Sequence, residues 1–195
     1  MTRVAFLVEG DLEQRFFQNV CPTSPVRKIN CNGEDVSIEA IAKRIGTLGR
    51  LLQKRYSPVV VVFDRERRTK SCEDIEAEFR KALTHEDINV PIIVGIPDRD
   101  TENWILADPE SFARCVEIER SRIPLALEGT KGKTEIKKLL PPKKTYVETI
   151  DGVTWLKKAR PTVMRENSPS FARFADALKD IQCWWLQEGH LVARS

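Results

Sequence analysis

The chain has 195 residues, which suits one sizeable domain or a core domain with a small appendage. Apolar residues make up 41% and charged residues 31%, a balance typical of soluble globular proteins. The longest apolar run, residues 59–63, is too short to cross a bilayer, which argues against a membrane protein. The five cysteines are scattered and form neither a disulfide framework nor a zinc-site spacing. We therefore expect a soluble, cytoplasmic protein with reduced thiols.

The net charge of +3 is unevenly distributed along the chain. Residues 1–110 carry 16 Lys and Arg against 19 Asp and Glu, whereas residues 111–195 carry 16 against 10. An acidic first part joined to a basic second part favours a metal site beside a polyanion-binding surface. The same charges could simply lie on two solvent-exposed surfaces without any binding role. Both the functional and the purely solvated interpretation of the charge distribution stay open.

Short β-branched apolar runs predict buried strands at residues 3–8, 58–63 and 90–96, with a weaker candidate at 26–31. The intervening segments fit helices because their apolar residues recur with a helical period. These predicted helices cover residues 11–20, 37–55 and 71–83. Alternating strands and helices imply right-handed crossovers and a mainly parallel sheet, so the expected fold class is α/β.

Beyond residue 110 the sequence contains no strong strand signal. Short helices are predicted at residues 134–140, 153–159 and 168–181, and a serine followed by proline at 168–169 is a good helix start. We expect an α/β core at residues 1–110 and a helical, basic extension at residues 111–195 that packs on the core.

Each of the three strong strands ends in acidic residues. These are Glu9 after the first strand, Asp64 and Glu66 after the second, and Asp98, Asp100 and Glu102 after the third. Because the carboxyl ends of parallel strands share one edge of a sheet, these side chains are expected to approach one another there. Carboxylates crowded together repel one another, and a bound cation would offset their negative charge. Ligation by oxygen atoms alone favours Mg²⁺ or Mn²⁺ as that cation. For Asp98 a turn-capping role is the alternative, and for Asp100 and Glu102 a second metal and a structural role both stay open.

The segment 131–144 holds six lysines in fourteen residues, flanking a glycine turn. Candidate phosphate contacts are Lys131, Lys133, Lys137 and Lys138, together with Arg65 among the acids of the second strand. Lysine lacks the fork of arginine, so sequence-specific readout is not indicated. A solvated surface helix is the alternative for the lysines. No phosphate-loop or dinucleotide-binding motif is present, which disfavours a self-contained ATPase.

The Val-Glu-Gly at residues 8–10, followed by Asp64 and Glu66 after a VVVVF strand, resembles the TOPRIM domain of topoisomerases, primases and OLD-type nucleases. The domain usually has Asp where this chain has Glu66, which is also an oxygen ligand but one methylene longer. Two further stretches, residues 102–108 and 168–174, are similar to an uncharacterised TOPRIM-like family whose members tend to sit beside an ATPase in phage-defence or abortive-infection operons. The resemblance covers residues 4 to 180.

The resemblance implies metal-dependent chemistry at a phosphodiester bond of DNA or RNA. Glu9 would ligate a metal or act as general acid or base, and Asp64 and Glu66 would hold Mg²⁺ or Mn²⁺. It also implies a partner ATPase and a role as the toxic effector of an antiviral defence system. Tyr56 and Tyr146 lie in no recognisable context, so water is the expected nucleophile and strand passage is not expected.

Two other functions stay open. The first is a non-catalytic, TOPRIM-like docking or regulatory subunit of an ATPase complex. The presence of Glu66, where the family usually has Asp, permits this alternative. The second is a metal-dependent phosphatase or nucleotide hydrolase that acts on small phosphates without needing the lysines of residues 131–144.

Overall fold

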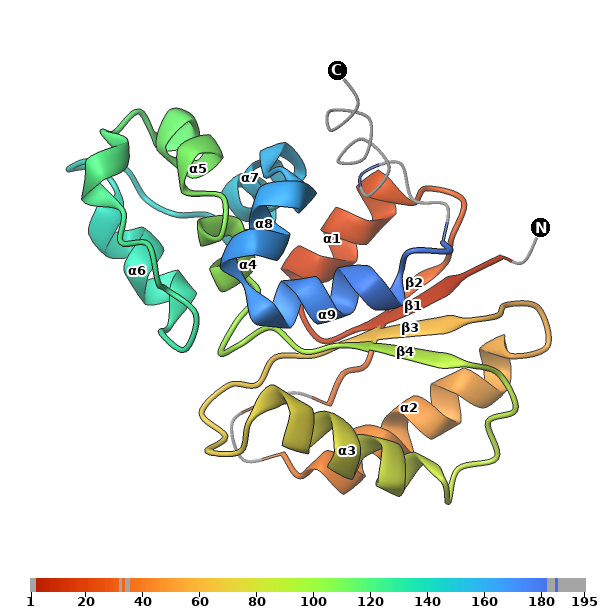
Figure 1. Ribbon diagram of the computed structural model, residues 1–195. Helices are drawn as coiled ribbons and strands as arrows, with labels where there is room; N and C mark the ends of the chain where they lie inside the picture. Colours follow the sequence, from red (N-terminus) through yellow and green to blue (C-terminus); the bar gives the residue numbers. More distant parts are fainter. Residues whose placement is uncertain (1–2, 32, 34–35, 182–184, 186–195) are drawn as a thin grey trace.

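A four-stranded sheet forms the centre of the computed structural model, which describes residues 3–31, 33, 36–181 and 185 (Figure 1). The strands are β1 (Ala5–Val8), β2 (Val26–Lys28), β3 (Val59–Val62) and β4 (Ile92–Gly95). Their order is β2-β1-β3-β4, and every neighbouring pair is parallel. The predicted α/β fold class is confirmed, including the weaker strand candidate, which is β2. The arrangement is consistent with a TOPRIM-like fold.

Three helices connect the strands, and a series of short helices follows β4. The connecting helices are α1 (Asp11–Val20), α2 (Ile38–Leu52) and α3 (Cys72–Leu83). The later helices are α4 (Glu102–Leu106), α5 (Pro109–Val116), α6 (Gly132–Leu139), α7 (Val153–Lys158), α8 (Pro161–Asn167) and α9 (Pro169–Ala177). A 3₁₀ turn, η1 (Arg120–Arg122), and a π-helical turn, η2 (Glu148–Gly152), lie between them. In the described part of the chain no strand follows Gly95, as the sequence predicts.

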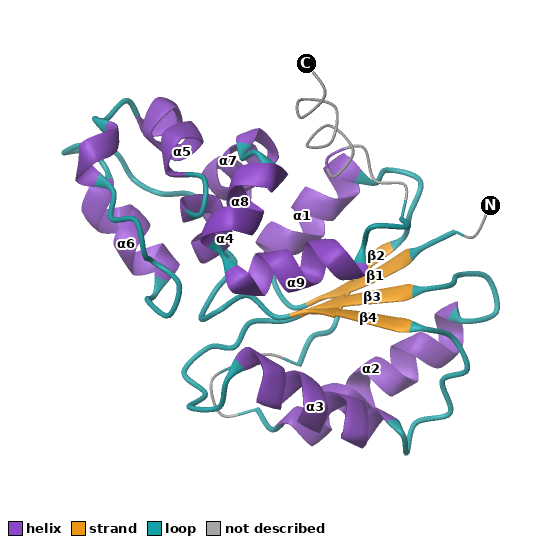
Figure 2. Cartoon of the chain, viewed as in Figure 1, coloured by secondary structure: helices purple, strands orange, loops and turns teal. Residues whose placement is uncertain are grey.

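Side chains alternate between the two faces of the sheet and so create two separate apolar cores. Leu7 and Val61 point into a core shared with α2 and α3, whereas Phe6 and Val62 point into a core shared with α1 and the later helices. Figure 2 shows these two helical layers on opposite sides of the strands. Burial on both faces explains why the strands are apolar at every position.

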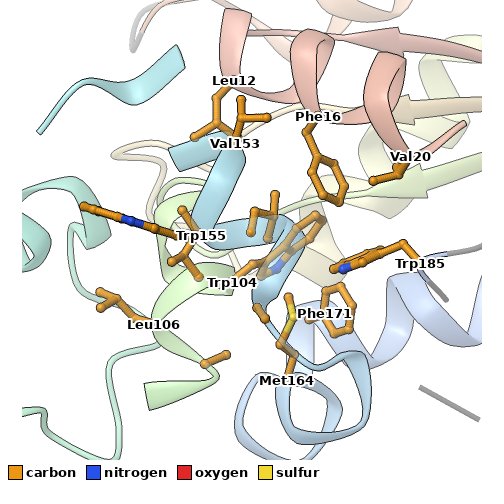
Figure 3. Packing of buried hydrophobic residues seen from close by; sticks show 14 of the residues in the cluster. Leu12, Phe16, Val20, Trp104, Leu106, Val153, Trp155, Met164, Phe171 and Trp185 are labelled. Carbon is orange, nitrogen blue, oxygen red and sulfur yellow. The ribbon is translucent and has the colours of Figure 1, made fainter. Parts of the chain in front are cut away.

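The layer that contains α1 and the later helices is held together by aromatic side chains (Figure 3). Trp104 of α4 stacks on Phe174 of α9, with ring centroids 5.2 Å apart, and its indole N–H donates to the Ser170 hydroxyl. Trp185 packs edge-on against Phe16 of α1. These contacts fix α4, and with it the acidic loop that precedes α4, against the sheet.

Side-chain caps begin several helices where the sequence predicts them. The Ser71 hydroxyl accepts a hydrogen bond from the Asp74 N–H at the start of α3. The Ser168 hydroxyl likewise accepts from the Phe171 N–H at the start of α9. The predicted starts of these two helices are therefore confirmed.

The predicted domain boundary after residue 110 falls inside α5. The helices beyond it share one apolar core with β1, β3 and α1, and together with α1 they cover one face of the sheet. A division into a core and an extension stays a prediction. Among the described residues, no helix is long and apolar enough to span a membrane.

Candidate functional site

A pocket of about 310 Å³ opens at the carboxyl edge of the sheet, between the ends of β1, β3 and β4 and the amino-terminal end of α6. Its lining is almost entirely charged. The lining residues are Glu9, Gly10, Glu13, Asp64, Glu66, Arg99, Asp100, Glu102, Lys131, Lys133, Thr134, Lys137 and Glu148. Carboxylates and cations therefore meet in one cavity, at the edge where α/β sheets bind their ligands.

The centre of the pocket lies between β1 and β3, where the chain connections diverge to opposite faces of the sheet. Glu9 follows β1, is 7% exposed, and its Oε2 accepts a hydrogen bond of 2.8 Å from the Asp64 N–H at the end of β3. This bond fixes the Glu9 carboxylate beside the Asp64 side chain. Glu9 and Asp64, predicted from separate strands, are thus brought together.

A second buried carboxylate, Glu13, lies in the first turn of α1. Its Oε2 accepts a hydrogen bond of 3.0 Å from the Gly10 N–H. A Cβ atom at Gly10 would lie 2.5 Å from the same oxygen, so the glycine makes room for this carboxylate. On the other side, the buried Thr101 hydroxyl donates to Asp64 Oδ1 at 3.2 Å.

Glu66 and Arg99 join the loops after β3 and β4. The Glu66 N–H donates to the Arg99 carbonyl at 2.9 Å, and the Arg99 guanidinium donates to the Glu66 carbonyl at 3.1 Å. Both residues have positive φ angles, 55° and 76°, which are unfavourable for residues with side chains. The Arg99 Nε also donates to the Gly129 carbonyl, so one side chain connects three loops around the pocket.

The far wall of the pocket is built by α6 and η2. The Lys133 ammonium pairs with Glu148 and lies 3.8 Å from Glu102 Oε1. The Tyr146 hydroxyl donates to the same Glu102 oxygen at 3.0 Å. Asp100 Oδ2 accepts from the Lys133 N–H at the start of α6, whereas its buried Oδ1 has no hydrogen-bond partner. Asp100 therefore caps α6 and keeps one oxygen available.

Burial raises the pKa of most pocket carboxylates, because a charged carboxylate loses solvation there. It raises the pKa of Glu9 to about 7, of Asp100 to about 6 and of Glu102 to about 8. The pKa of Asp64 is raised well above its ordinary value by burial and then by the negative charges of Glu13 and Glu9. The pocket therefore cannot hold all these groups ionised at neutral pH without a compensating cation.

Three predicted site residues lie outside the pocket lining. The Arg65 side chain is buried, pairs with Asp98, and donates to two main-chain carbonyls, including that of Arg68 at 2.7 Å. This pair holds the loops after β3 and β4 together. Lys138 points away from the pocket and pairs with Glu135 on the same helix. We therefore leave Asp98, Arg65 and Lys138 out of the proposed site.

The other predicted site residues all line the pocket: Glu9, Asp64, Glu66, Asp100, Glu102, Lys131, Lys133 and Lys137. Sequence reasoning missed Glu13, Arg99 and Glu148. Glu13 lies four residues after Glu9, a spacing that places it near the end of β1, but an acid in a first helical turn also has a simple dipole role. Glu148 lies in a segment without any periodic pattern, so no sequence signal marks it.

The donor chemistry of the pocket fits a hard divalent cation, since the available ligands are carboxylate oxygens and several resist ionisation without one. In the described ranges, however, no group of three or more His, Cys, Asp or Glu side chains is arranged to hold a metal ion. The ligand types therefore match Mg²⁺ or Mn²⁺, whereas the present side-chain positions do not form a closed ligand set.

A family model described as a domain of unknown function, DUF4276, matches residues 8–179. This chain belongs to the DUF4276 family. Every lining residue of the pocket lies within the matched segment, so the pocket is part of the DUF4276 domain itself. Comparison with curated proteins and with solved structures gives no significant match.

Proposed function

We propose that this DUF4276 protein is a hydrolase that uses Mg²⁺ or Mn²⁺ to cleave phosphodiester bonds in DNA or RNA. The observation that carries the proposal is the composition of one pocket, in which carboxylates from three strand ends face lysines from α6. The acidic side suits a divalent cation, and the basic side suits the phosphate that the cation would activate. The TOPRIM resemblance supports the same chemistry.

In this proposal Glu9, Asp64 and Glu66 hold the cation, and Glu13 adjoins them. Asp100 and Glu102 are the candidates for a second cation. A bound divalent cation supplies polarisation of the phosphate and lowers the pKa of a water molecule. The chain contributes the orientation of its carboxylates, through the Thr101 hydroxyl on Asp64 and the Tyr146 hydroxyl on Glu102.

The cations of the pocket would bind the phosphate oxygens and offset charge that develops there. Lys133 is held in place, because it is only partly exposed and pairs with Glu148. A substrate phosphate would share or replace that carboxylate. Glu9, whose pKa is raised to about 7, is suited to exchange a proton near neutral pH if it is not itself a ligand.

Cleavage assays on plasmid DNA, single-stranded DNA and total RNA, each with Mg²⁺ and with Mn²⁺, test the proposal. The parent chain is compared with Glu9→Gln and Asp64→Asn, which remove charge with little change of shape. We expect both variants to lose at least about a hundredfold in rate, as is typical when a catalytic group is removed. A matched control is Glu39→Gln, which removes an exposed acid from the first turn of α2, on the opposite face of the sheet. Unchanged cleavage by Asp64→Asn would refute the site.

Among the described residues no three His, Cys, Asp or Glu side chains are arranged to hold a metal ion, and this observation favours a second candidate, a docking or regulatory subunit without catalysis. Titration with Mn²⁺, followed by its electron paramagnetic resonance signal, separates the two. A catalytic site binds Mn²⁺ and loses it in Glu9→Ala, whereas a docking module binds none. The pocket volume of about 310 Å³ also fits a small phosphate compound, and a mononucleotide substrate in the same assays tests that hypothesis.

The proposed partner is an ATPase, and the proposed biological role is that of a cytoplasmic effector of antiviral defence. The TOPRIM resemblance supports both, and co-purification with an ATPase encoded beside this chain tests the first.

A further inference from the structure

A second hollow, of about 320 Å³, lies between α5 and α7 and shares no lining residue with the candidate pocket. Its lining residues are Ser111, Arg114, Cys115 and Lys158. The two helices lie side by side in Figure 1, in the layer opposite α2 and α3. None of the four residues has a role in the proposed hydrolysis.

The hollow is positively charged, in contrast to the acidic centre of the candidate pocket. Burial raises the pKa of the Cys115 thiol, and the positive charges of Lys158, Arg114 and Lys144 act in the opposite direction. Arg114 and Lys158 line the hollow together with the thiol, and the charge of Lys144 also acts on it. Within the described residues, none of them pairs with an acidic side chain.

The nearest acid does not neutralise this surface, because it is already paired. Asp108 accepts hydrogen bonds from both the Arg160 guanidinium and the Ser111 N–H, and its side chain is fully buried. All three cations, by contrast, are exposed. The Arg114 guanidinium donates to the buried Ser111 hydroxyl at 3.3 Å. An anion that enters the hollow would therefore meet positive charge that pairs with no described acid, with Arg114 held in place by this hydroxyl.

We propose that this hollow is a second phosphate-binding site, formed by Arg114, Lys144 and Lys158, which holds the sugar–phosphate backbone of a polynucleotide at a distance from the candidate pocket. The inference rests on the proposed function for the identity of the anion, and it narrows the substrate class from phosphodiesters in general to extended strands.

The basic segment 131–144 connects the two sites. Lys131, Lys133 and Lys137 line the candidate pocket, and Lys144, at the end of the same segment, is near enough for its charge to act on the Cys115 thiol of the hollow. The segment is therefore a continuous basic connection, along which a single strand is expected to run from one site to the other.

The chemistry of the hollow indicates contact with the backbone and not with bases. Among the described residues no aromatic side chain lines it, so they offer no stacking surface. Lysine and a single arginine attract phosphate without selecting sequence. The expected binding is therefore independent of sequence and weakens as salt is added.

Cys115 provides a reporter inside the hollow itself. The protein is treated with iodoacetamide in EDTA, with and without a 20-nucleotide single-stranded oligonucleotide, and alkylation of Cys115 is followed by peptide mass spectrometry. We expect the oligonucleotide to slow alkylation about tenfold when it is present at about ten times its Kd. The ratio of the two rates is compared within each variant, so a changed thiol reactivity does not affect the result.

Lys158→Glu is expected to abolish the protection, and Arg114→Gln to reduce it. The matched control is Lys43→Glu, the same charge reversal at an exposed position of α2 on the opposite face of the sheet, which should leave protection intact. Removing both Arg114 and Lys158 should make the slope of log K against log salt shallower by roughly 1.4, since each contact to a single strand contributes about 0.7.

Alkylation of Cys115 at the same rate with saturating oligonucleotide would overturn the inference. Equal protection by poly-glutamate of the same charge would overturn the assignment to a phosphate backbone and favour an acidic protein partner. Because the measurement is made without metal, it is separate from cleavage. Protection of Cys115 without cleavage would support the second phosphate-binding site and count against the proposed hydrolase. Cleavage without protection would support the hydrolase and overturn the second site.

Discussion

At the scale of single residues, the candidate site contains two kinds of side chain. Some are predictable from their position directly after a parallel strand, and others are recognised only in the folded structure. Glu9, Asp64 and Glu66 were predictable because acids directly after buried strands have no packing role and share the sheet edge. Glu13 and Glu148 were not, since one resembles a helix-dipole residue and the other follows no pattern. Arg65 is buried against Asp98, and a basic residue among acids gives no sign of that burial in the sequence.

The raised pKa values predict an unusual pH dependence of stability for the metal-free protein. Glu9 has a pKa of about 7 in the fold and an ordinary value of 4.5, so the folded state binds its proton more tightly than the unfolded state. As pH rises from 4.5 to 7, the unfolded chain ionises first, and the free energy of unfolding falls. The upper limit for this group is about 3 kcal/mol, and Glu102 acts in the same direction.

Urea unfolding in EDTA at pH 5, 6, 7 and 8 measures this effect. We expect stability to decrease across the series, and Mg²⁺ to restore it at pH 8, because a bound cation favours the ionised carboxylates. Glu9→Gln should flatten the pH dependence. A metal-free protein that becomes more stable from pH 5 to pH 8 would show that the pocket carboxylates do not behave as described.

At the scale of helices and strands, the sequence predicts most elements because their signals are local. All four strands match predicted segments, and α1, α2 and α3 match the predicted stripes and caps. The helix α8 was missed, since only Pro161 and Met164 of its seven residues are buried and no stripe results. The position of α6 over the strand ends, which creates the pocket, was also beyond prediction because it depends on tertiary contacts.

Gly132, the first residue of α6, sets the distance between that helix and the acidic loop. A Cβ atom there would lie 2.5 Å from the Asn103 backbone nitrogen and 2.5 Å from Asp100 Oδ1. Alanine favours helix formation by about 1 kcal/mol, but a backbone atom cannot move aside as a flexible side chain can. We expect Gly132→Ala to destabilise the fold by about 1–3 kcal/mol and to weaken oligonucleotide binding.

Thermal unfolding and fluorescence anisotropy test both effects of Gly132→Ala. Gly49→Ala is the matched control, because its Cβ would meet only the end of the Ile88 side chain, in the other helical layer. That control should keep its stability to within about 1 kcal/mol and keep its affinity for oligonucleotide. Equal affinities for the two variants would show that α6 does not need its present position for binding.

At the scale of the whole molecule, the later helices form one of the two layers that cover the sheet. Among the described residues, Phe6, Val8, Val60 and Val62 are covered by α1 and by the segment from α4 onward. A fragment of residues 1–110 would keep α1 and α4 but lose the later helices, and would therefore expose part of this apolar face to water. We expect the fragment to bind the dye ANS and to lack a cooperative thermal transition, whereas the full chain unfolds in one transition.

Circular dichroism in the near ultraviolet, with ANS fluorescence on both chains, checks this expectation. A fragment with sharp melting and no dye binding would support an independent core with an added extension.

The all-parallel sheet also has a consequence for how the chain folds during synthesis. Ala5 pairs with Val59 and Val59 with Ile92, so no strand can pair with a near neighbour in sequence as hairpins do. β1 and β2 can pair early, but the central β1–β3 pair must wait until β3 has left the ribosome, and one face stays only partly covered until residues beyond α4 follow. Such non-local pairing slows folding and prolongs the exposure of apolar surface. The newly made chain is therefore expected to need chaperone protection over the interval in which its central strands are present and its covering helices are not.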